Sequence, residues 1–184
     1  ASLEAQGIDP PKLAVGYVRE LGLEFHAGYR LNMGFMDMTP MEERSFNGPF
    51  YTHPEWRCID RDGRDVGRLS YAFPGVRQLV MSILREIAAY DIDGLCLLHN
   101  RQPPHVMYEA PLVEGFEAET GLDPRTLEER DGRWLRYRCV ALTTFMREVR
   151  AALDEIGARN GRRLPISAWV MGSKAENVFY GLDL

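Results

Sequence analysis

The stretch Val76–Arg101, VRQLVMSILREIAAYDIDGLCLLHNR, decides the predicted fold because it contains a complete helix–turn–strand unit. Apolar residues recur every three or four positions up to Ala88, as expected for a helix that packs one face on a core. Asp93-Gly94 then marks a turn, and residues 94–99 have the apolar character of a short buried strand. Three polar residues stand at the tip of this strand: His99, Asn100 and Arg101. Ligands of parallel α/β folds bind where the strands end, so this tip is a candidate site.

The same order of helix and strand occurs twice more along the chain. A predicted helix that begins at Pro10-Pro11 precedes a strand over 23–31, and a helix over 135–156 precedes a strand over 166–171. Strands that alternate with helices of this length predict a parallel sheet with right-handed crossovers. The segments after the first two strands, 32–73 and 100–134, are much longer than the helix-to-strand connections. Long loops on one side of a parallel sheet are typical of a binding face.

The predicted fold class is therefore α/β, with the parallel βα units of a TIM (β/α)8-type barrel. A complete barrel normally needs about 250 residues, whereas three strands are visible here. We therefore expect residues 1–184 to form a single domain that is a truncated or partial barrel. The alternative is a complete, small, doubly wound domain. A partial barrel would leave sheet edges open, and open edges favour self-association.

Composition argues against several classes of partner and cofactor. The net charge is −5 and the chain has only two lysines, so no basic stripe is available for nucleic acid. No run of 18 apolar residues occurs, and no membrane span is predicted. The three cysteines, Cys58, Cys96 and Cys139, lack CxxC spacing, which favours thiols over zinc ligands or a disulfide framework. The sequence thus predicts neither a metal nor another cofactor.

Several segments resemble, in their order and spacing, the uncharacterised glycoside-hydrolase-like (β/α)8 barrels of bacteria, which are relatives of the α-amylase-type and family-10-like hydrolases. These segments are LEFHAGYRL (23–31), HPEW (53–56), the stretch from Leu69 to Asn100, GLDP (121–124), ISAWVMG (166–172) and YGLDL (180–184). The resemblance implies a carbohydrate-binding cleft at the carboxyl ends of the strands, and hydrolysis of a glycosidic bond by two carboxylates. An oligosaccharide or polysaccharide would be the partner, and an extracellular or periplasmic location would fit such a substrate.

The sequence departs from this family at one informative position. The strand after Asp93-Gly94 typically ends in an acidic residue in those barrels, but here it ends in Leu98, His99 and Asn100. If the chain is a hydrolase, the acids must come from elsewhere. Glu109 and Asp37, in the two long loops, are the candidate catalytic residues. If neither acts, the chain is a non-catalytic carbohydrate-binding protein that has lost the strand-end acid.

The candidate binding residues stand on or just after the predicted strands. Because side chains alternate along a strand, His26 and Arg30 share a face, and we expect that face to line the barrel interior. A buried, mutually satisfied polar network is the alternative for these two residues. Trp169 is either a stacking platform for a sugar ring or part of the core. The full predicted binding set is His26, Arg30, Asn32, His99, Asn100, Arg101 and Trp169.

A metal-dependent hydrolase is the third hypothesis. It would require His26, His53 and His99 to converge, with Glu109 as a further ligand. No HxH or HExxH spacing supports this arrangement. The leading interpretation is therefore a glycoside hydrolase-like protein that binds carbohydrate and hydrolyses a glycosidic bond with carboxylates, without a metal.

Overall fold

The structure is a computed structural model that describes residues 3–32, 48–101 and 103–183. Its strands are β1 (His26–Arg30), β2 (Arg57–Ile59), β3 (Asp65–Leu69), β4 (Gly94–Leu98) and β5 (Ile166–Trp169). Its α-helices are α1 (Pro10–Glu20), α3 (Gly48–Thr52), α4 (Pro74–Ala88), α5 (Ala110–Thr120), α6 (Gly132–Arg159) and α7 (Lys174–Phe179). Single 3-10 turns lie at Glu4–Gln6, Pro54–Trp56 and Pro124–Thr126.

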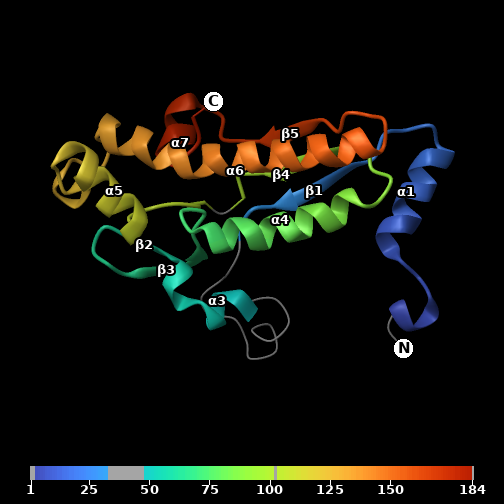
Figure 1. The fold of residues 1–184 in the computed structure, drawn as a ribbon, viewed down its shortest axis with the longest axis horizontal. Helices are drawn as coiled ribbons and strands as arrows, with labels where there is room; N and C mark the ends of the chain where they lie inside the picture. Colours follow the sequence, from blue (N-terminus) through green and yellow to red (C-terminus); the bar gives the residue numbers. More distant parts are fainter. Residues whose placement is uncertain (1–2, 33–47, 102, 184) are drawn as a thin grey trace.

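Three strands form a parallel sheet in the order β1-β4-β5. The expectation of a parallel sheet is confirmed, and its three strands are adjacent and arranged in chain order. Helices α4 and α6 run alongside each other across the sheet (Figure 1). Strands β2 and β3 form a separate antiparallel pair. The chain is therefore an α/β protein with a small parallel sheet.

The predicted TIM (β/α)8-type barrel is wrong. The described residues contain three parallel strands in an open sheet and one antiparallel pair, with β1 and β5 at the edges of the sheet. A closed barrel requires a consistent strand number, tilt and register all the way round. The spacing of apolar residues predicts each helix and strand by itself. It does not show whether the strands close into a barrel. Nor is the fold doubly wound within the described residues, because α4 and α6 cover the same face of the sheet.

Part of each long segment after the first two strands has regular structure of its own. The β2–β3 pair turns at Asp60, whose carboxylate accepts the backbone N–H groups of Asp62 at 2.9 Å and Arg64 at 2.8 Å. Gly63 takes a positive φ of 83° in this turn, a conformation that suits glycine. Helix α5 occupies the second segment and ends at Gly121, where φ is 74°. Neither the β2–β3 pair nor α5 was predicted from the sequence, because short strands and a weakly amphipathic helix show little periodicity.

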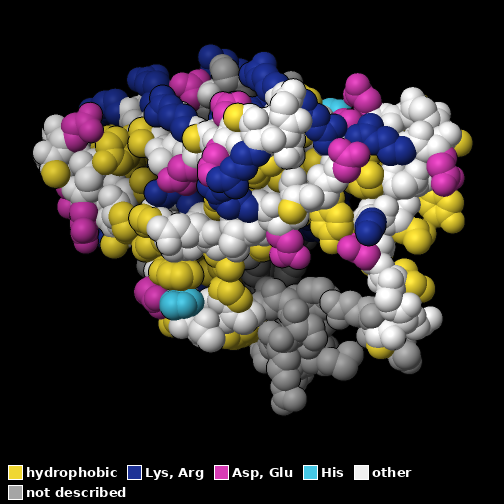
Figure 2. Space-filling model, turned by 45° about the vertical axis from the view of Figure 1, so that its right-hand side comes forward, with side chains coloured by type: hydrophobic (Ala, Val, Ile, Leu, Met, Phe, Trp, Pro, Cys, Tyr) yellow, Lys and Arg dark blue, Asp and Glu magenta, His cyan; other side chains and the backbone are white. Residues whose placement is uncertain are grey.

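The core lies between the sheet and its two long helices. Leu95 and Leu97 of β4 are fully buried, and they belong to one apolar cluster with side chains of α4 and α6. These helix residues include Val80, Leu84, Leu142, Phe145 and Val149. On the surface, Arg77 pairs with Glu148 and Arg85 with Glu155, which joins the two helices. Basic and acidic side chains are intermingled on the face drawn in Figure 2. No described helix is long and apolar enough to cross a membrane.

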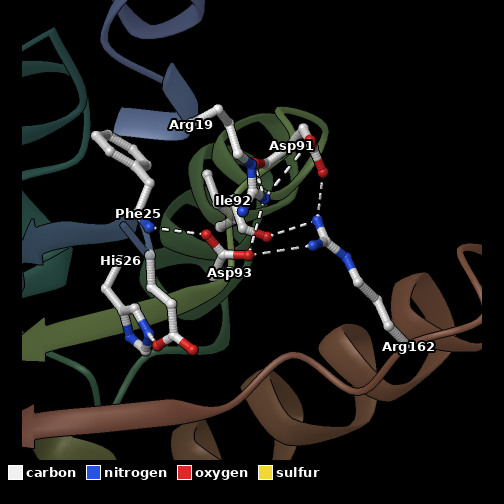
Figure 3. A network of polar contacts seen from close by, with 8 residues as sticks. Arg19, Phe25, His26, Asp91, Ile92, Asp93 and Arg162 are labelled. Carbon is white, nitrogen blue, oxygen red and sulfur yellow. Dashed lines mark hydrogen bonds and ion pairs between the residues drawn. The ribbon is translucent and has the colours of Figure 1, made fainter. Parts of the chain in front are cut away.

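A network of ion pairs holds together the amino-terminal ends of the strands (Figure 3). The carboxylate of Asp93 accepts the backbone N–H of Phe25 at 2.7 Å and is paired with Arg19 at 2.8 Å and Arg162 at 3.3 Å. These partners come from α1, from the residue before β1 and from the α6–β5 connection. The candidate functional site lies at the opposite, carboxyl-terminal ends of the strands.

Candidate functional site

The strand register places Arg30, Leu98 and Trp169 in one row across the sheet. Arg30 is paired with Leu98, and Leu98 with Trp169, at the last residue of each strand. Paired residues of parallel strands point to the same face, and Leu95 and Leu97 occupy the face covered by helices. The row therefore lies on the opposite face, which we call the open face.

The open face presents an aromatic ring and a guanidinium group to solvent. The Trp169 side chain is 60% exposed, and Arg30 is also exposed. Since neighbouring strands are about 4.8 Å apart, the backbones of these two residues are separated by about 10 Å, with Leu98 between them. An exposed tryptophan beside an aliphatic floor and a planar cation is an arrangement that can stack on one face of a sugar ring and bind its hydroxyls.

Asn100 lies next to this row. The backbone N–H groups of His99 and Asn100 both donate to the carbonyl of Trp169, at 2.9 and 3.1 Å. The Oδ1 atom of Asn100 is buried and accepts no hydrogen bond from the described residues. Asn32 is half-buried beyond the end of β1, and Arg101 is exposed beyond β4. The strand tips thus bring Arg30, Asn100 and Trp169 to one end of the sheet.

His99 lies on the other side of the sheet from that row. Its imidazole is 2% exposed, and its Nδ1 has no hydrogen-bond partner among the described residues. The carbonyl of His99 accepts a hydrogen bond from Nε2 of His105, which is also buried, at 3.0 Å. Burial, together with the positive charge that His105 would carry when protonated, lowers the pKa of His99 to about 3. A neutral imidazole held in this way supports the strand tip from below, and it is not exposed to a ligand on the open face.

Glu109 is fully buried at the start of α5. Both of its carboxylate oxygens accept the backbone N–H of Met107, at 2.9 and 3.0 Å, and Oε1 also accepts that of Ile59 at 3.4 Å. Burial raises the pKa of Glu109, although the hydrogen bonds from Met107 and from Cys58 and Ser70 oppose the shift. These contacts favour a structural role that joins the β2–β3 pair to α5. Asp37, the other candidate acid, lies outside the described residues.

The remaining histidines are far from this end of the sheet or occupied by local contacts. His26 is at the start of β1, about 13 Å along the strand from Arg30, and its Nε2 is 3.3 Å from Glu24. His53 stacks on Trp56 and contacts Glu55. Across the described ranges, no group of three or more His, Cys, Asp or Glu residues could hold a metal ion.

The predicted site residues stand on or just after the strands and do not include Leu98. The alternation of buried and half-buried residues in Gly94–Leu98 shows which face Leu98 occupies. Leu95 and Leu97 point to the core, and Leu98 does not. The same alternation separates His99 from Asn100. Adjacent tip residues therefore serve opposite faces of the sheet.

Comparison with known proteins finds similarity at the level of structure. No family model matches the chain, and no curated protein matches it. Among solved structures, the chain is similar to α-L-fucosidase isoenzyme 2 from Paenibacillus thiaminolyticus, with a TM-score of 0.61 and 17% sequence identity. The match covers 91% of this chain and 24% of that chain, so this chain spans about a quarter of the fucosidase. At this level of identity the similarity shows the fold alone, which is therefore like part of a glycosidase.

Proposed function

We propose that this chain is a glycoside-hydrolase-like protein that binds carbohydrate on the open face, at the carboxyl ends of β1, β4 and β5. The observation that carries this proposal is the row of Arg30, Leu98 and Trp169, in which an exposed indole and a guanidinium flank an apolar floor. The similarity in fold to a fucosidase supports the choice of carbohydrate over other small ligands.

The chemistry of the row matches the two kinds of surface that a sugar ring presents. The apolar C–H face of a pyranose packs on an aromatic ring, as the exposed side of Trp169 would allow. The hydroxyl groups around the ring need directional donors and acceptors. The guanidinium of Arg30 offers N–H donors, which the hydroxyl oxygens of a sugar can accept. Together these groups could orient one sugar unit at the strand tips.

Binding without hydrolysis is the form of the proposal that the described carboxylates support. Glycosidases of the usual kind require two carboxyl groups about 5–9.5 Å apart on either side of the bond. Glu109 is occupied by backbone N–H groups and is buried, which supports a structural role over proton donation to a sugar. Hydrolysis with Glu109 and Asp37 as the acids remains the alternative.

Titration of a panel of oligosaccharides, followed by amide chemical shifts in NMR, tests the proposal. A fucosylated oligosaccharide belongs first in the panel because the structural neighbour is a fucosidase by name. We expect shifts at the tips of β1, β4 and β5, and a loss of affinity of about tenfold in Trp169→Ala, which corresponds to about 1.4 kcal/mol. Val140→Ala is the matched control, because Val140 is a similarly exposed apolar residue on α6. If no saccharide binds, or if Trp169→Ala binds as tightly as the parent, the proposal is wrong.

Hydrolysis of aryl glycosides by the parent, Glu109→Gln and Asp37→Asn distinguishes the two forms of the proposal. The non-catalytic form predicts no turnover by any of the three proteins, and unchanged saccharide affinity in Glu109→Gln. Turnover by the parent that disappears in either folded variant would establish the hydrolase instead.

A further inference from the structure

A cavity of about 250 Å³ lies between the β4–α5 connection, α6 and the end of α7. Its lining includes Met107 and Tyr108 from the β4–α5 connection, Arg138 from α6, and Phe179 and Tyr180 at the end of α7. The cavity is smaller than the pockets of drug-sized ligands, which begin at about 300 Å³. Its size and aromatic walls suit a small ligand that has an apolar body.

Arg138 brings a positive charge into this cavity, and the carboxylates of Glu109 and Glu129 act on it only from beyond ion-pair distance. Its side chain is 5% exposed, and no described carboxylate lies within ion-pair distance of it. Of its guanidinium nitrogens, Nη2 donates to the carbonyl of Phe179 at 2.8 Å, whereas Nε is buried without a hydrogen-bond acceptor among the described residues. A buried charge normally has an ionic partner, because desolvation without one is costly.

A second unsatisfied donor belongs to Trp134, one helical turn before Arg138 on α6. The indole Nε1 of Trp134 is buried and has no acceptor among the described residues. The Arg138 guanidinium carbon lies 5.8 Å from the Trp134 ring and 5.9 Å from the rings of both Tyr108 and Phe179. These aromatic faces attract the cation but provide no lone pairs in the plane of the guanidinium. The surroundings of Arg138 therefore combine two orphaned donors with a shortage of acceptors.

We propose that this cavity is a binding site for a small organic carboxylate, whose oxygens pair with Arg138 and whose apolar body packs on the aromatic walls. Guanidinium and carboxylate groups match in geometry, since two parallel N–H groups meet two oxygens. The cavity shares no lining residue with the row of Arg30, Leu98 and Trp169, and the proposal does not depend on the carbohydrate site.

Glu129 favours a singly charged carboxylate over a more highly charged anion as the ligand of this cavity. This exposed residue also lines the cavity, so a ligand there meets one guanidinium and one carboxylate. A phosphate dianion would be repelled by Glu129 more strongly than a monoanion, and it would gain nothing from the apolar walls. A single carboxylate on an apolar body fits both features of the cavity.

Benzoate is a suitable probe, with benzamide as its uncharged counterpart of the same shape. We expect benzoate to raise the midpoint of thermal unfolding in a dose-dependent way at constant ionic strength, because a ligand that binds only the folded state stabilises it. Benzamide and inorganic phosphate should have at least tenfold weaker effects. Equal effects of benzoate and benzamide, or a stronger effect of phosphate, would overturn the carboxylate assignment.

Substitutions then locate the benzoate site. Arg138→Gln should raise the Kd for benzoate at least tenfold, whereas Arg136→Gln, at an exposed position on the same helix, should leave it unchanged. Arg138→Met provides a second test if the glutamine variant folds poorly, because an apolar side chain of similar length is readily accommodated in place of a buried charge. Equal losses in the Arg136 and Arg138 variants would refute the site.

Glu129→Gln tests whether the ligand or Glu129 itself is the counter-ion of Arg138. If the cavity binds a carboxylate, removing the negative charge of Glu129 should tighten benzoate binding about twofold to fivefold. If Glu129 serves as the ionic partner of Arg138 in solution, the same change should lower stability without any gain in affinity, and the proposal fails.

Discussion

The carboxylate of Asp93, just before β4, accepts the backbone N–H of Phe25, just before β1, over 2.7 Å (Figure 3). This hydrogen bond lowers the pKa of Asp93, and the guanidinium groups of Arg19 and Arg162 lower it further. A lowered pKa in the folded state means that the stabilisation is fully present above the unfolded value of about 3.9. It is lost as the pH falls through the folded value.

Replacing Asp93 with asparagine should destabilise the protein by about 1–2 kcal/mol at pH 7, because the change weakens the hydrogen bond to Phe25 and removes both ion pairs. Urea denaturation measures the effect. Asp91→Asn is the matched comparison, since the exposed side chain of Asp91 is paired with the same two arginines, whereas the carboxylate of Asp93 is 15% exposed and also accepts the N–H of Phe25. Equal effects of the two substitutions would show that the Asp93 network adds nothing beyond surface charge.

Gly157 allows the end of α6 to approach the segment that carries Arg162. A Cβ atom at this position would overlap the carbonyl oxygen of Arg162, whose own N–H donates to the carbonyl of Gly157 at 3.0 Å. Gly157→Ala should therefore cost about 1–3 kcal/mol of stability despite the better helix propensity of alanine. Gly16→Ala on α1 meets nothing within 4 Å and should instead be stabilising. Thermal unfolding of the two variants checks the opposite signs, and stabilisation by both would contradict the close approach.

Stability should fall as the pH is lowered from about 6.5 towards 4, because His99 and His105 are buried as neutral imidazoles. Burial lowers their pKa values to about 3 and about 4, so the unfolded chain binds protons that the folded protein does not. Each histidine contributes up to about 1.4 kcal/mol per pH unit in this range. The raised pKa of Glu109 acts in the opposite direction, and a variant is therefore needed to isolate the histidines.

In His99→Gln, the slope of unfolding free energy against pH should decrease by up to about 1.4 kcal/mol per pH unit between pH 6 and 4.5. Urea titrations at several pH values measure the slope. Between pH 7 and 8 the parent and the variant should have the same slope, since the buried imidazoles are neutral there. Parallel curves over the acidic range would show that His99 does not remain neutral in the folded protein.

The outer edge of β5 should mediate self-association. Pro165 and Trp169 accept hydrogen bonds from Leu95 and His99 of the β4 segment, so the intervening backbone of Ala168 faces away from β4. Exposed edges of this kind pair readily with another chain. Ala168→Pro, which removes the outward N–H, should shift sedimentation towards the monomer, whereas Ala168→Ser should not. A parent that stays monomeric at high concentration would argue against association through this edge.

Local sequence determined the three βα units. The apolar spacing in Val76–Ala88, the turn at Asp93-Gly94 and the strand that follows all depend on residues near one another in the chain. Alternation along β1 also placed His26 and Arg30 on the same face. These features could be predicted because helix and strand periodicity follow from backbone geometry alone.

The burial of Arg138 could have been predicted from the sequence, although it was not. It lies at helical spacing from Trp134 and Leu142, which are fully buried, so its position on the buried side of α6 could have been inferred. Its lack of a carboxylate partner could not, because that depends on Tyr108 and Phe179, which reach it from distant segments.

Tertiary structure decided which of the predicted site residues share a surface. Glu109 became a buried acceptor because the backbones of Met107 and Ile59 converge on it. Arg30 and Trp169 came to flank Leu98, while the sheet stayed open in the described part of the chain. Strand register, closure and burial arise from contacts between residues far apart in the chain, and the free energy of those contacts depends on packing in three dimensions that no local pattern of residues specifies.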